Sequence, residues 1–395
     1  MQKLVQKYIT FVLIAAILVV GIGGYFWYTQ KNQPASPTKN PPTTLTQDEQ
    51  DALVPEEPIQ FTNSGPAPEF VGLTNWVNTG EPESESQTES QITDTQKPTA
   101  TKDKSAKTAN SKKVAKPVAP SISINDLKDK VGLITFWTYS CIDCTKLIPY
   151  ISKWGKEYKD EGLVSIGIHT PQFAFEKVSD NFTNAVKAQK IQYPVAQDND
   201  YKTWSAYHTQ FWPTTYLIDR SGTIVYTQIG GGKYGQLEKA VRTVLGLEGE
   251  YKTPDAPIVD TANKTSDMFT GLLKLSAFGG TEKPSPADQI YIFPKKLGKN
   301  KFALEGSWKF DQESLIHTQG YSRVLLNFNA SQAFMVASSP EPVTVSIYID
   351  DKLAKGIIVK DRDLYQLLDS LTPGEHTLRL EIPDQDLQIF SFTFG

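Results

Sequence analysis

The chain has 395 residues, a formal net charge of −4 and only two cysteines, Cys141 and Cys144. At about 150 residues per domain, this length allows two or three domains. The charge balance argues against a basic nucleic-acid-binding protein, and two cysteines cannot build a disulfide-rich scaffold. Hydrophobic residues make up 39% of the chain. The usual range is roughly 45–50%, so part of the chain is expected to lack a packed core.

The first expected element is a transmembrane anchor at residues 9–28, after a cytoplasmic tail at 1–8. This run is nearly uncharged, and a helix of about 20 residues spans the roughly 30 Å of a hydrocarbon core. Lys3 and Lys7 precede the run, which favours a single pass of the cytoplasmic membrane with the N-terminus inside. A cleaved signal peptide is the alternative. An uncleaved signal-anchor is favoured because the aromatic cluster 25–28 suits a membrane interface.

Residues 29–119 account for the low hydrophobic fraction. They are rich in Pro, Thr, Ser, Glu and Lys, a composition that cannot bury enough apolar area to offset chain entropy. We therefore expect a flexible tether. Its charged blocks at 81–119 could instead be a docking signal, although a solvated spacer is the simpler interpretation. Within the tether, a short island at about 61–80 contains Phe70 and Trp76 and is expected to be ordered.

The pattern of residues 120–248 predicts a layered α/β domain. Apolar runs predict buried strands at 131–137 and 163–168, and helical spacing predicts an intervening helix at 141–159. The elements expected after them are helices at 173–190 and 200–208 around a short strand at 193–196, a hairpin at 214–228 and a helix at 234–245. Strand–helix–strand units followed by a hairpin and a helix are typical of an α/β fold.

The last part of the chain has a different pattern. Residues 285–395 contain short alternating stretches, such as 343–349 and 376–382, between Gly, Pro and Asp turns. This pattern predicts an all-β antiparallel sandwich. Residues 249–284, rich in Pro, Thr and Gly, are expected to be a connector between the two folded domains.

Cys141 and Cys144 form a C-x-x-C motif between a predicted strand and a predicted helix. In this setting the motif acts as a redox dithiol. The helix N-terminus would stabilise a thiolate at Cys141, which attacks a substrate disulfide, and Cys144 would resolve the mixed disulfide. The expected reactive group is thus a redox-active disulfide formed by the two cysteines, with no other cofactor.

A zinc half-site and a purely structural disulfide are the alternative interpretations. Zinc requires four ligands, and the spacing of His169 and His208 fits no common zinc finger, so no metal is expected. Asp143 lies inside the motif, where its negative charge opposes a thiolate at Cys141, whereas Lys146 acts in the opposite direction. Both are candidates for tuning the dithiol.

The segment 136–144, FWTYSCIDC, resembles the thioredoxin-like domain of DipZ-type cytochrome c biogenesis proteins, which are relatives of the TlpA/ResA membrane-anchored thiol-disulfide reductases. Similar segments follow at 167–176 and 211–214, and the resemblance covers roughly 61–80 and 120–395. It implies a thioredoxin-like fold for 120–248 and a carbohydrate-binding-like, jelly-roll-like β-sandwich for 285–395. It also implies that the island at 61–80 packs on the thioredoxin-like domain, while 81–119 loops out.

The resemblance assigns further residues to the site. Pro213 matches a cis-proline that faces the dithiol, and Trp212 before it, together with Trp137, is implied to contact substrate. His169 and Glu176 are further candidates for tuning. Gln172 is a third, although relatives commonly have Glu at that position.

Two other departures concern the dithiol itself. Asp143 stands where the family usually has Asn, and Gly230–Gly232 replaces a Gly-Glu-Gly segment.

The function implied is that of a membrane-anchored, extracytoplasmic thiol-disulfide oxidoreductase, acting as a reductase of envelope protein disulfides or of apocytochrome c cysteines. DipZ proteins usually carry a multi-span electron-importing domain, whereas this chain shows a single anchor. The resemblance therefore implies a separate, CcdA-like transmembrane electron donor. The alternatives are a thiol peroxidase on the same fold and a glycan-binding envelope protein with a vestigial thioredoxin-like domain.

The β-sandwich has no assigned task in this interpretation. It is expected to bind a glycan or a protein, and its candidate stacking residues are Trp308, Tyr321, Tyr348 and Tyr365. Aromatic residues in strands more often belong to the core.

Overall fold

The computed structural model describes residues 59–80, 120–249, 253–254, 264–372, 374–383 and 386–395. The expected cytoplasmic tail, the transmembrane anchor, the tether apart from its island and part of the connector lie outside these residues. Within the described ranges, no helix combines the length and the apolar character needed to cross a membrane.

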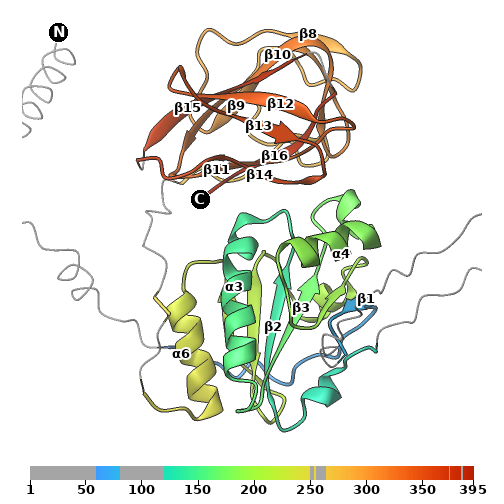
Figure 1. Ribbon diagram of the computed structural model, residues 1–395, viewed down its shortest axis with the longest axis vertical. Coiled ribbons are helices and arrows are strands. Elements are labelled where there is room, and N and C mark those ends of the chain that lie inside the picture. Colours follow the sequence, from blue (N-terminus) through green and yellow to red (C-terminus); the bar gives the residue numbers. More distant parts are fainter. Residues whose placement is uncertain (1–58, 81–119, 250–252, 255–263, 373, 384–385) are drawn as a thin grey trace, which may run out of the picture. The chain divides into compact units, whose positions relative to one another are not determined.

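Residues 59–80 and 120–249 form an α/β domain around a six-stranded sheet (Figure 1). The strand order is β1–β4–β3–β2–β5–β6. Strands β2, β3 and β4 are parallel, whereas β1, β5 and β6 run antiparallel to their neighbours. The strands are β1 (Thr74–Val77), β2 (Val131–Trp137), β3 (Leu163–His169), β4 (Val195–Gln197), β5 (Thr214–Ile218) and β6 (Ile224–Ile229).

The predicted helices occur in the expected order, but one of them is divided, and η1 (Ile124–Leu127) is an additional element that the sequence did not predict. The other helices are α3 (Ile142–Glu157), η2 (Ala174–Lys177), α4 (Ser179–Ala188), α5 (Lys202–Ala206) and α6 (Tyr234–Leu245). The helix predicted at 173–190 is divided into η2 and α4. Val178, which separates them, is extended, with φ −72° and ψ 122°. The strand at 131–137 and the helix at 234–245 have the bounds that the sequence predicts.

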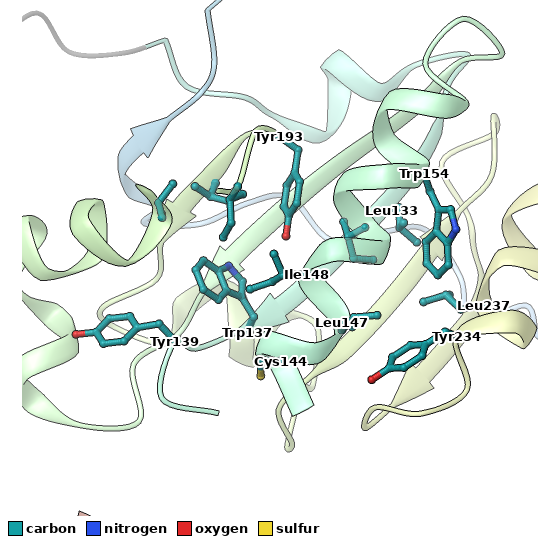
Figure 2. Close-up of a cluster of buried hydrophobic side chains, with 14 of the residues drawn as sticks. Leu133, Trp137, Tyr139, Cys144, Leu147, Ile148, Trp154, Tyr193, Tyr234 and Leu237 are labelled. Carbon is teal, nitrogen blue, oxygen red and sulfur yellow. The ribbon is translucent and has the colours of Figure 1, made fainter. Parts of the chain in front are cut away.

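Helix α3 supplies much of the core of the α/β domain. Leu147, Ile151 and Trp154 recur at helical spacing and are almost fully buried, because residues three and four apart lie on one face of a helix. Burying such a side chain stabilises the fold by about 1.5–3 kcal/mol. Figure 2 shows Cys144 at the edge of this cluster. The buried face of α3 therefore extends to the second cysteine of the motif.

The island at 61–80 packs against the α/β domain, as expected. Its strand β1 pairs with β4, and Thr74 lies opposite Gln197. Phe70 and Trp76 pack against a second apolar cluster, in which the Phe70 ring stacks on Tyr207 with 6.3 Å between the ring centroids. The segment 81–119, expected to loop out, lies outside the described residues.

The described residues from 264 onward form a ten-stranded antiparallel sheet, which we call the β region. This confirms the all-β antiparallel prediction. The main strand order is β13–β12–β15–β10–β16–β11–β14, while β7 pairs with β16 and β8 pairs with β9, which pairs with β10. The strands are β7 (Met268–Phe269), β8 (Gln289–Tyr291), β9 (Lys301–Phe310), β10 (Leu315–Asn329), β11 (Ala333–Ser338), β12 (Val343–Ile349), β13 (Lys352–Val359), β14 (Asp363–Leu368), β15 (Glu375–Ile382) and β16 (Gln388–Phe394).

Strand β10 connects the two halves of the β region. Leu315 and Ile316 at its start pair with β16, whereas 322–329 pair with β15. The alternation seen in the sequence places Val343, Val345 and Ile347 of β12 in the core. Strand β7 lies inside the stretch 249–284 that was expected to be only a connector, so the β region begins earlier than predicted.

Candidate active site

The C-x-x-C motif lies at the carboxyl ends of the two central parallel strands. Strands β2 and β3 pair in register up to Trp137 and His169, so the segments that follow these two residues leave the sheet at the same edge. Cys141 is the N-cap of α3, and its sulfur accepts a hydrogen bond from the Cys144 backbone N–H at 3.2 Å. Ligand sites of open α/β sheets commonly lie at this edge.

The two cysteines differ in accessibility. Cys141 is partly exposed, whereas Cys144 is 1% exposed, and both are free thiols in this structure. Burial raises the pKa of Cys144, and its hydrogen bond with Cys141 acts in the same direction, whereas a backbone hydrogen bond from Thr138 lowers it. Cys141 is therefore the more accessible residue of the pair, while burial favours the thiol form of Cys144.

Thr138 connects both cysteines to a buried carboxyl group. Its hydroxyl donates to Glu176 Oε1 at 2.6 Å. Its carbonyl accepts from the Cys141 N–H at 3.3 Å, and its backbone also hydrogen-bonds to the Cys144 thiol. One residue thus contacts the carboxyl group and each member of the dithiol. Sequence reasoning did not single out Thr138, and its place between β2 and the motif is the signal that could have indicated it.

Glu176 is the buried acid beneath the motif, with no exposed surface. Its Oε2 accepts from the backbone N–H of Phe173 at 3.0 Å and from that of Gln172, and its own carbonyl accepts from Gln197 Nε2 at 2.9 Å. Burial raises the pKa of Glu176, although the hydrogen bonds from Thr138 and the two backbone groups oppose that shift. A buried carboxyl group of this kind is a marker of functional sites.

His169, a candidate for tuning the dithiol, lies inside the domain. It is fully buried, with its ring stacked on Tyr139 at 5.3 Å between centroids and edge-on to Trp137 at 5.2 Å. Burial lowers the pKa of His169 to about 3, so the imidazole is neutral at physiological pH. Its Nε2 lies 3.4 Å from the Thr138 hydroxyl, whereas Nδ1 has no hydrogen-bond partner among the described residues.

Two departures from the family pattern are neighbours in space. A Cβ atom built on Gly231 would lie 3.2 Å from the Cβ of Asp143. A larger side chain at 231 would therefore crowd Asp143, and the glycine leaves room for it.

Lys146 is half-buried near the start of α3, two residues after Cys144. Its Nζ donates to Gln332 Oε1 of the β region at 2.7 Å. Burial lowers the pKa of Lys146, whereas Asp143 and Asp369 raise it.

The Trp212–Pro213 peptide bond is cis, the geometry that the resemblance implies. Phe136 of β2 pairs with Thr214, so Pro213 lies beside the chain segment that leads to the motif. Trp212 is half-buried against Trp204, with 4.5 Å between the ring centroids.

The expectation that Trp137 contacts substrate needs correction. Its side chain is 1% exposed, because β2 is covered on both faces, so the ring belongs to the core. Gln172 is half-buried, and its side-chain oxygen lies 3.4 Å from the Ser140 hydroxyl.

Within the described residues, no group of three or more His, Cys, Asp or Glu side chains is placed to hold a metal ion. His208, considered as a ligand beside His169, is exposed, whereas His169 is buried.

Two family models match the chain. The model described as "Thioredoxin like C-terminal domain" matches residues 265–395, and the "AhpC/TSA family" model matches 105–227. Protein DipZ of Mycobacterium bovis is 30% identical over 343 residues, which are 85% of this chain and 44% of that protein. The chain thus spans less than half the length of DipZ.

Two smaller relatives match part of the chain. Thiol-disulfide oxidoreductase ResA of Bacillus cereus is 32% identical over 117 residues, covering 30% of this chain and 65% of ResA. Thiol-disulfide oxidoreductase YkuV of Bacillus subtilis is 27% identical over 117 residues, covering 30% of this chain and 78% of YkuV. The resemblance to DipZ and to ResA-like thiol-disulfide oxidoreductases is therefore confirmed.

Proposed function

We propose that this DipZ homologue is a thiol-disulfide oxidoreductase that uses Cys141 and Cys144 as its redox dithiol and acts as a reductase. The observation that carries the proposal is the asymmetry of the pair. Cys141 caps α3 and is partly exposed, whereas Cys144 is buried and donates its backbone N–H to the Cys141 sulfur. This is the arrangement that an attacking and a resolving cysteine require.

The reaction has two exchange steps. Cys141 first loses its proton, and its thiolate attacks one sulfur of a substrate disulfide. This forms a mixed disulfide and releases the other substrate sulfur as a thiolate, which takes up a proton. Cys144 then loses its proton and attacks the Cys141 sulfur. The Cys141–Cys144 disulfide forms, the second substrate sulfur leaves, and it takes up the second proton. Two electrons and two protons pass from the dithiol to the substrate.

The proposal places the enzyme at the outer side of the cytoplasmic membrane, held by the segment at 9–28. Disulfides persist in that compartment, so a reductase there must be supplied with electrons, for which we propose a CcdA-like transmembrane donor. The proposed substrates are envelope protein disulfides or apocytochrome c cysteines. Pro213 lies beside the chain segment that leads to the motif, and the proposal assigns Trp212 and Pro213 contact with an extended substrate segment.

A glycan or protein ligand of the β region is part of the proposal. Among the candidate stacking residues, Tyr321 is 59% exposed, whereas Trp308 is fully buried and belongs to the core. Tyr348 and Tyr365 are half-buried. Tyr321 is therefore the residue to test first for stacking on a ligand.

The test of the proposed reaction is thiol-dependent reduction of insulin disulfides by Cys141→Ser and Cys144→Ser variants. Cys141→Ser is expected to reduce insulin no faster than the thiol alone. Cys144→Ser is expected to stop after the first step and to accumulate a mixed disulfide, seen as a mass increase of the chain. Thr145→Ser, which keeps a hydroxyl on the same turn of α3, serves as a control and should stay active.

Full activity in both cysteine variants would contradict the proposal. Stopped-flow measurement of peroxide consumption by the same proteins separates this reaction from that of a thiol peroxidase. A peroxidase would consume peroxide faster than it reduces insulin.

A further inference from the structure

The loop that holds Glu176 is itself held by the β region. This segment, residues 172–176, supplies the two backbone N–H groups that bind the Glu176 carboxyl group. Between those donors and the acid, Ala174 turns its own N–H outward to the carboxylate of Glu313, at 2.9 Å to Oε2 and 3.2 Å to Oε1. The β region thus supplies the acceptor for this backbone N–H.

Glu313 stands on a turn with little freedom to move. The turn joins β9, which ends at Phe310, to β10, which begins at Leu315. It packs so closely on Gly271 that a Cβ atom at that position would collide with the Glu313 backbone. The N–H groups of 272 and 273 donate to the carbonyls of 311 and 312, each at 2.9 Å. The carboxylate is therefore presented to Ala174 from a fixed base.

An aromatic contact holds the same loop from a second strand. Phe390 of β16 packs on Phe173 and Phe175, with 5.5 Å and 4.8 Å between ring centroids, and Phe269 of β7 approaches Phe173 at 6.3 Å. Phe173, Phe175 and Phe390 are all buried. Each such aromatic pair contributes about 0.5–1.5 kcal/mol beyond the area that it buries.

We propose that Glu313 and Phe390 are positioning residues for the dithiol: they fix the loop 172–176, and through it Glu176 and Thr138. Glu176 has no solvent to replace a lost donor, because it is fully buried. A displacement of Gln172 or Phe173 therefore changes how the carboxyl group holds Thr138. Thr138 in turn hydrogen-bonds to both cysteines, and hydrogen bonds of this kind have large effects in a low-dielectric interior.

This role makes the β region part of the redox machinery rather than an appended domain. It rests on the proposed function, because it assumes that Cys141 and Cys144 are the reacting pair. A purely structural contact would change the stability of the chain and leave the chemistry of the dithiol unaltered. The equilibrium constant of the dithiol with glutathione, together with the pH profile of Cys141 alkylation by iodoacetamide, separates the two roles.

The first experiment compares substitutions at Glu313 in the full chain. Glu313→Ala removes the acceptor and is expected to shift the glutathione equilibrium constant by about 3- to 10-fold. Glu313→Gln keeps an acceptor for the Ala174 N–H. Because the hydrogen bond is retained, the glutathione equilibrium constant of this variant should stay within about twofold of the parent value. Glu341→Ala removes an exposed acid elsewhere in the β region and should have no effect.

A double-substitution cycle tests the route of the effect. In a Glu176→Gln background, Glu313→Ala is expected to add less to the shift than it does alone, because both changes act on one network. Additive shifts would overturn the proposed route. If Glu313→Ala shifts the equilibrium constant and Glu313→Gln shifts it equally, the effect comes from the charge of Glu313. That result would also overturn the proposed route.

The aromatic contact provides an independent comparison. Phe390→Leu is expected to shift the glutathione equilibrium, whereas Phe328→Leu, which alters a buried ring elsewhere in the β region, should lower stability alone. If Phe390→Leu does not fold, the Glu313 series decides. The inference is overturned if the Glu313 and Phe390 variants leave the glutathione equilibrium constant unchanged. If the cysteine variants are inactive in the same assays, the proposed function stands.

Discussion

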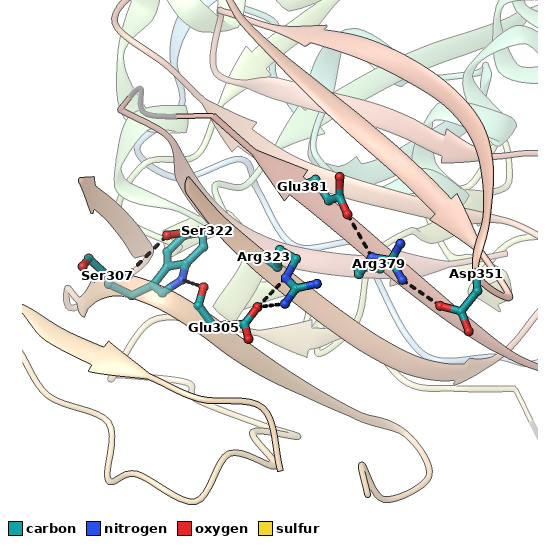
Figure 3. A network of polar contacts seen from close by, with 8 residues as sticks. Glu305, Ser307, Ser322, Arg323, Asp351, Arg379 and Glu381 are labelled. Atoms are coloured by element: carbon teal, nitrogen blue, oxygen red, sulfur yellow. Dashed lines mark hydrogen bonds and ion pairs between the residues drawn. The ribbon is translucent and has the colours of Figure 1, made fainter. Parts of the chain in front are cut away.

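The α/β domain and the β region place their ionisable side chains differently. Beneath the dithiol, Glu176 and His169 have no exposed surface. In the β region, the charged network of Figure 3 lies across the outer surface of the sheet. There Arg323 pairs with Glu305, and Arg379 bridges Asp351 and Glu381, with 33% of the Arg323 side chain and 20% of the Arg379 side chain exposed.

This difference in burial distinguishes a candidate reactive site from a network of ion pairs near the surface. A buried ionisable group disfavours folding unless its partners compensate, so a cluster of them beside a reactive thiol indicates a site. Partly exposed ion pairs such as these are weakly stabilising and do not by themselves indicate a reaction. Arg379 also lies over the Tyr348 ring, 4.4 Å from its centroid. The two regions thus differ in whether their ionisable side chains are enclosed by the protein or partly open to solvent.

The largest expected effect comes from removing the buried acid. Glu176→Ala leaves the Thr138 hydroxyl and two backbone N–H groups without their acceptor, and should lower the free energy of unfolding by about 3 kcal/mol or more. Urea denaturation at pH 7 measures this loss of unfolding free energy.

Glu176→Gln is the matched control, because an amide oxygen can accept from the backbone N–H groups while Thr138 accepts from the amide nitrogen. A loss smaller than about 1 kcal/mol in the Ala variant would show that the buried acid is not supported by these contacts.

The second expected effect is on acid stability. The pKa of His169 is about 3 in the folded chain and 6.5 ordinarily, so the unfolded chain takes up the proton first. The stability contributed by the neutral ring is complete above pH 6.5 and is lost as the pH falls toward 3. Relative to His169→Gln, the parent should lose about 2 kcal/mol between pH 7 and pH 5.

Unfolding free energies of both proteins, measured across that pH range, provide the check. Parallel pH curves for the parent and His169→Gln would contradict a buried, neutral imidazole.

The smallest expected effect is on the outer network. Arg379→Ala removes two ion pairs and the contact with Tyr348, yet it should lower the free energy of unfolding by only about 1 kcal/mol or less. Thermal unfolding at low and high salt measures it, and the difference between parent and variant should shrink in high salt. A loss as large as that of Glu176→Ala would break the comparison between the two regions.

Local patterns were sufficient for many elements of the fold. The strand at 131–137 is an unbroken apolar run, and the helix at 234–245 ends where Gly246 adopts a left-handed conformation, so both were predicted with their observed bounds. The helix expected at 173–190 is interrupted at Val178, whose backbone is extended, with φ −72° and ψ 122°. Strand β7 has two residues, too few to show alternation.

The candidate site was only partly accessible to sequence reasoning. The cysteines and Pro213 belong to recognisable motifs, and the sequence suggested Glu176 as a tuning residue. The role of Thr138 depends on a partner 38 residues away, and that of Glu313 on a contact across 139 residues. No periodicity or spacing rule connects positions so far apart, so these contacts become evident only when the strands are assembled.

Strand β1 has a consequence for how the α/β sheet can pair with strands of other molecules. It occupies the edge of the α/β sheet beside β4, where unpaired backbone groups would otherwise accept a strand from another molecule. Asn75 and Asn78 have positive φ angles of 50° and 62°, and the pairing of β1 is irregular between Thr74 and Val77. A short, bent strand is a poor template for further pairing. The island at 61–80 therefore covers one edge of the α/β sheet and makes that edge a poor site for pairing with a strand of another molecule.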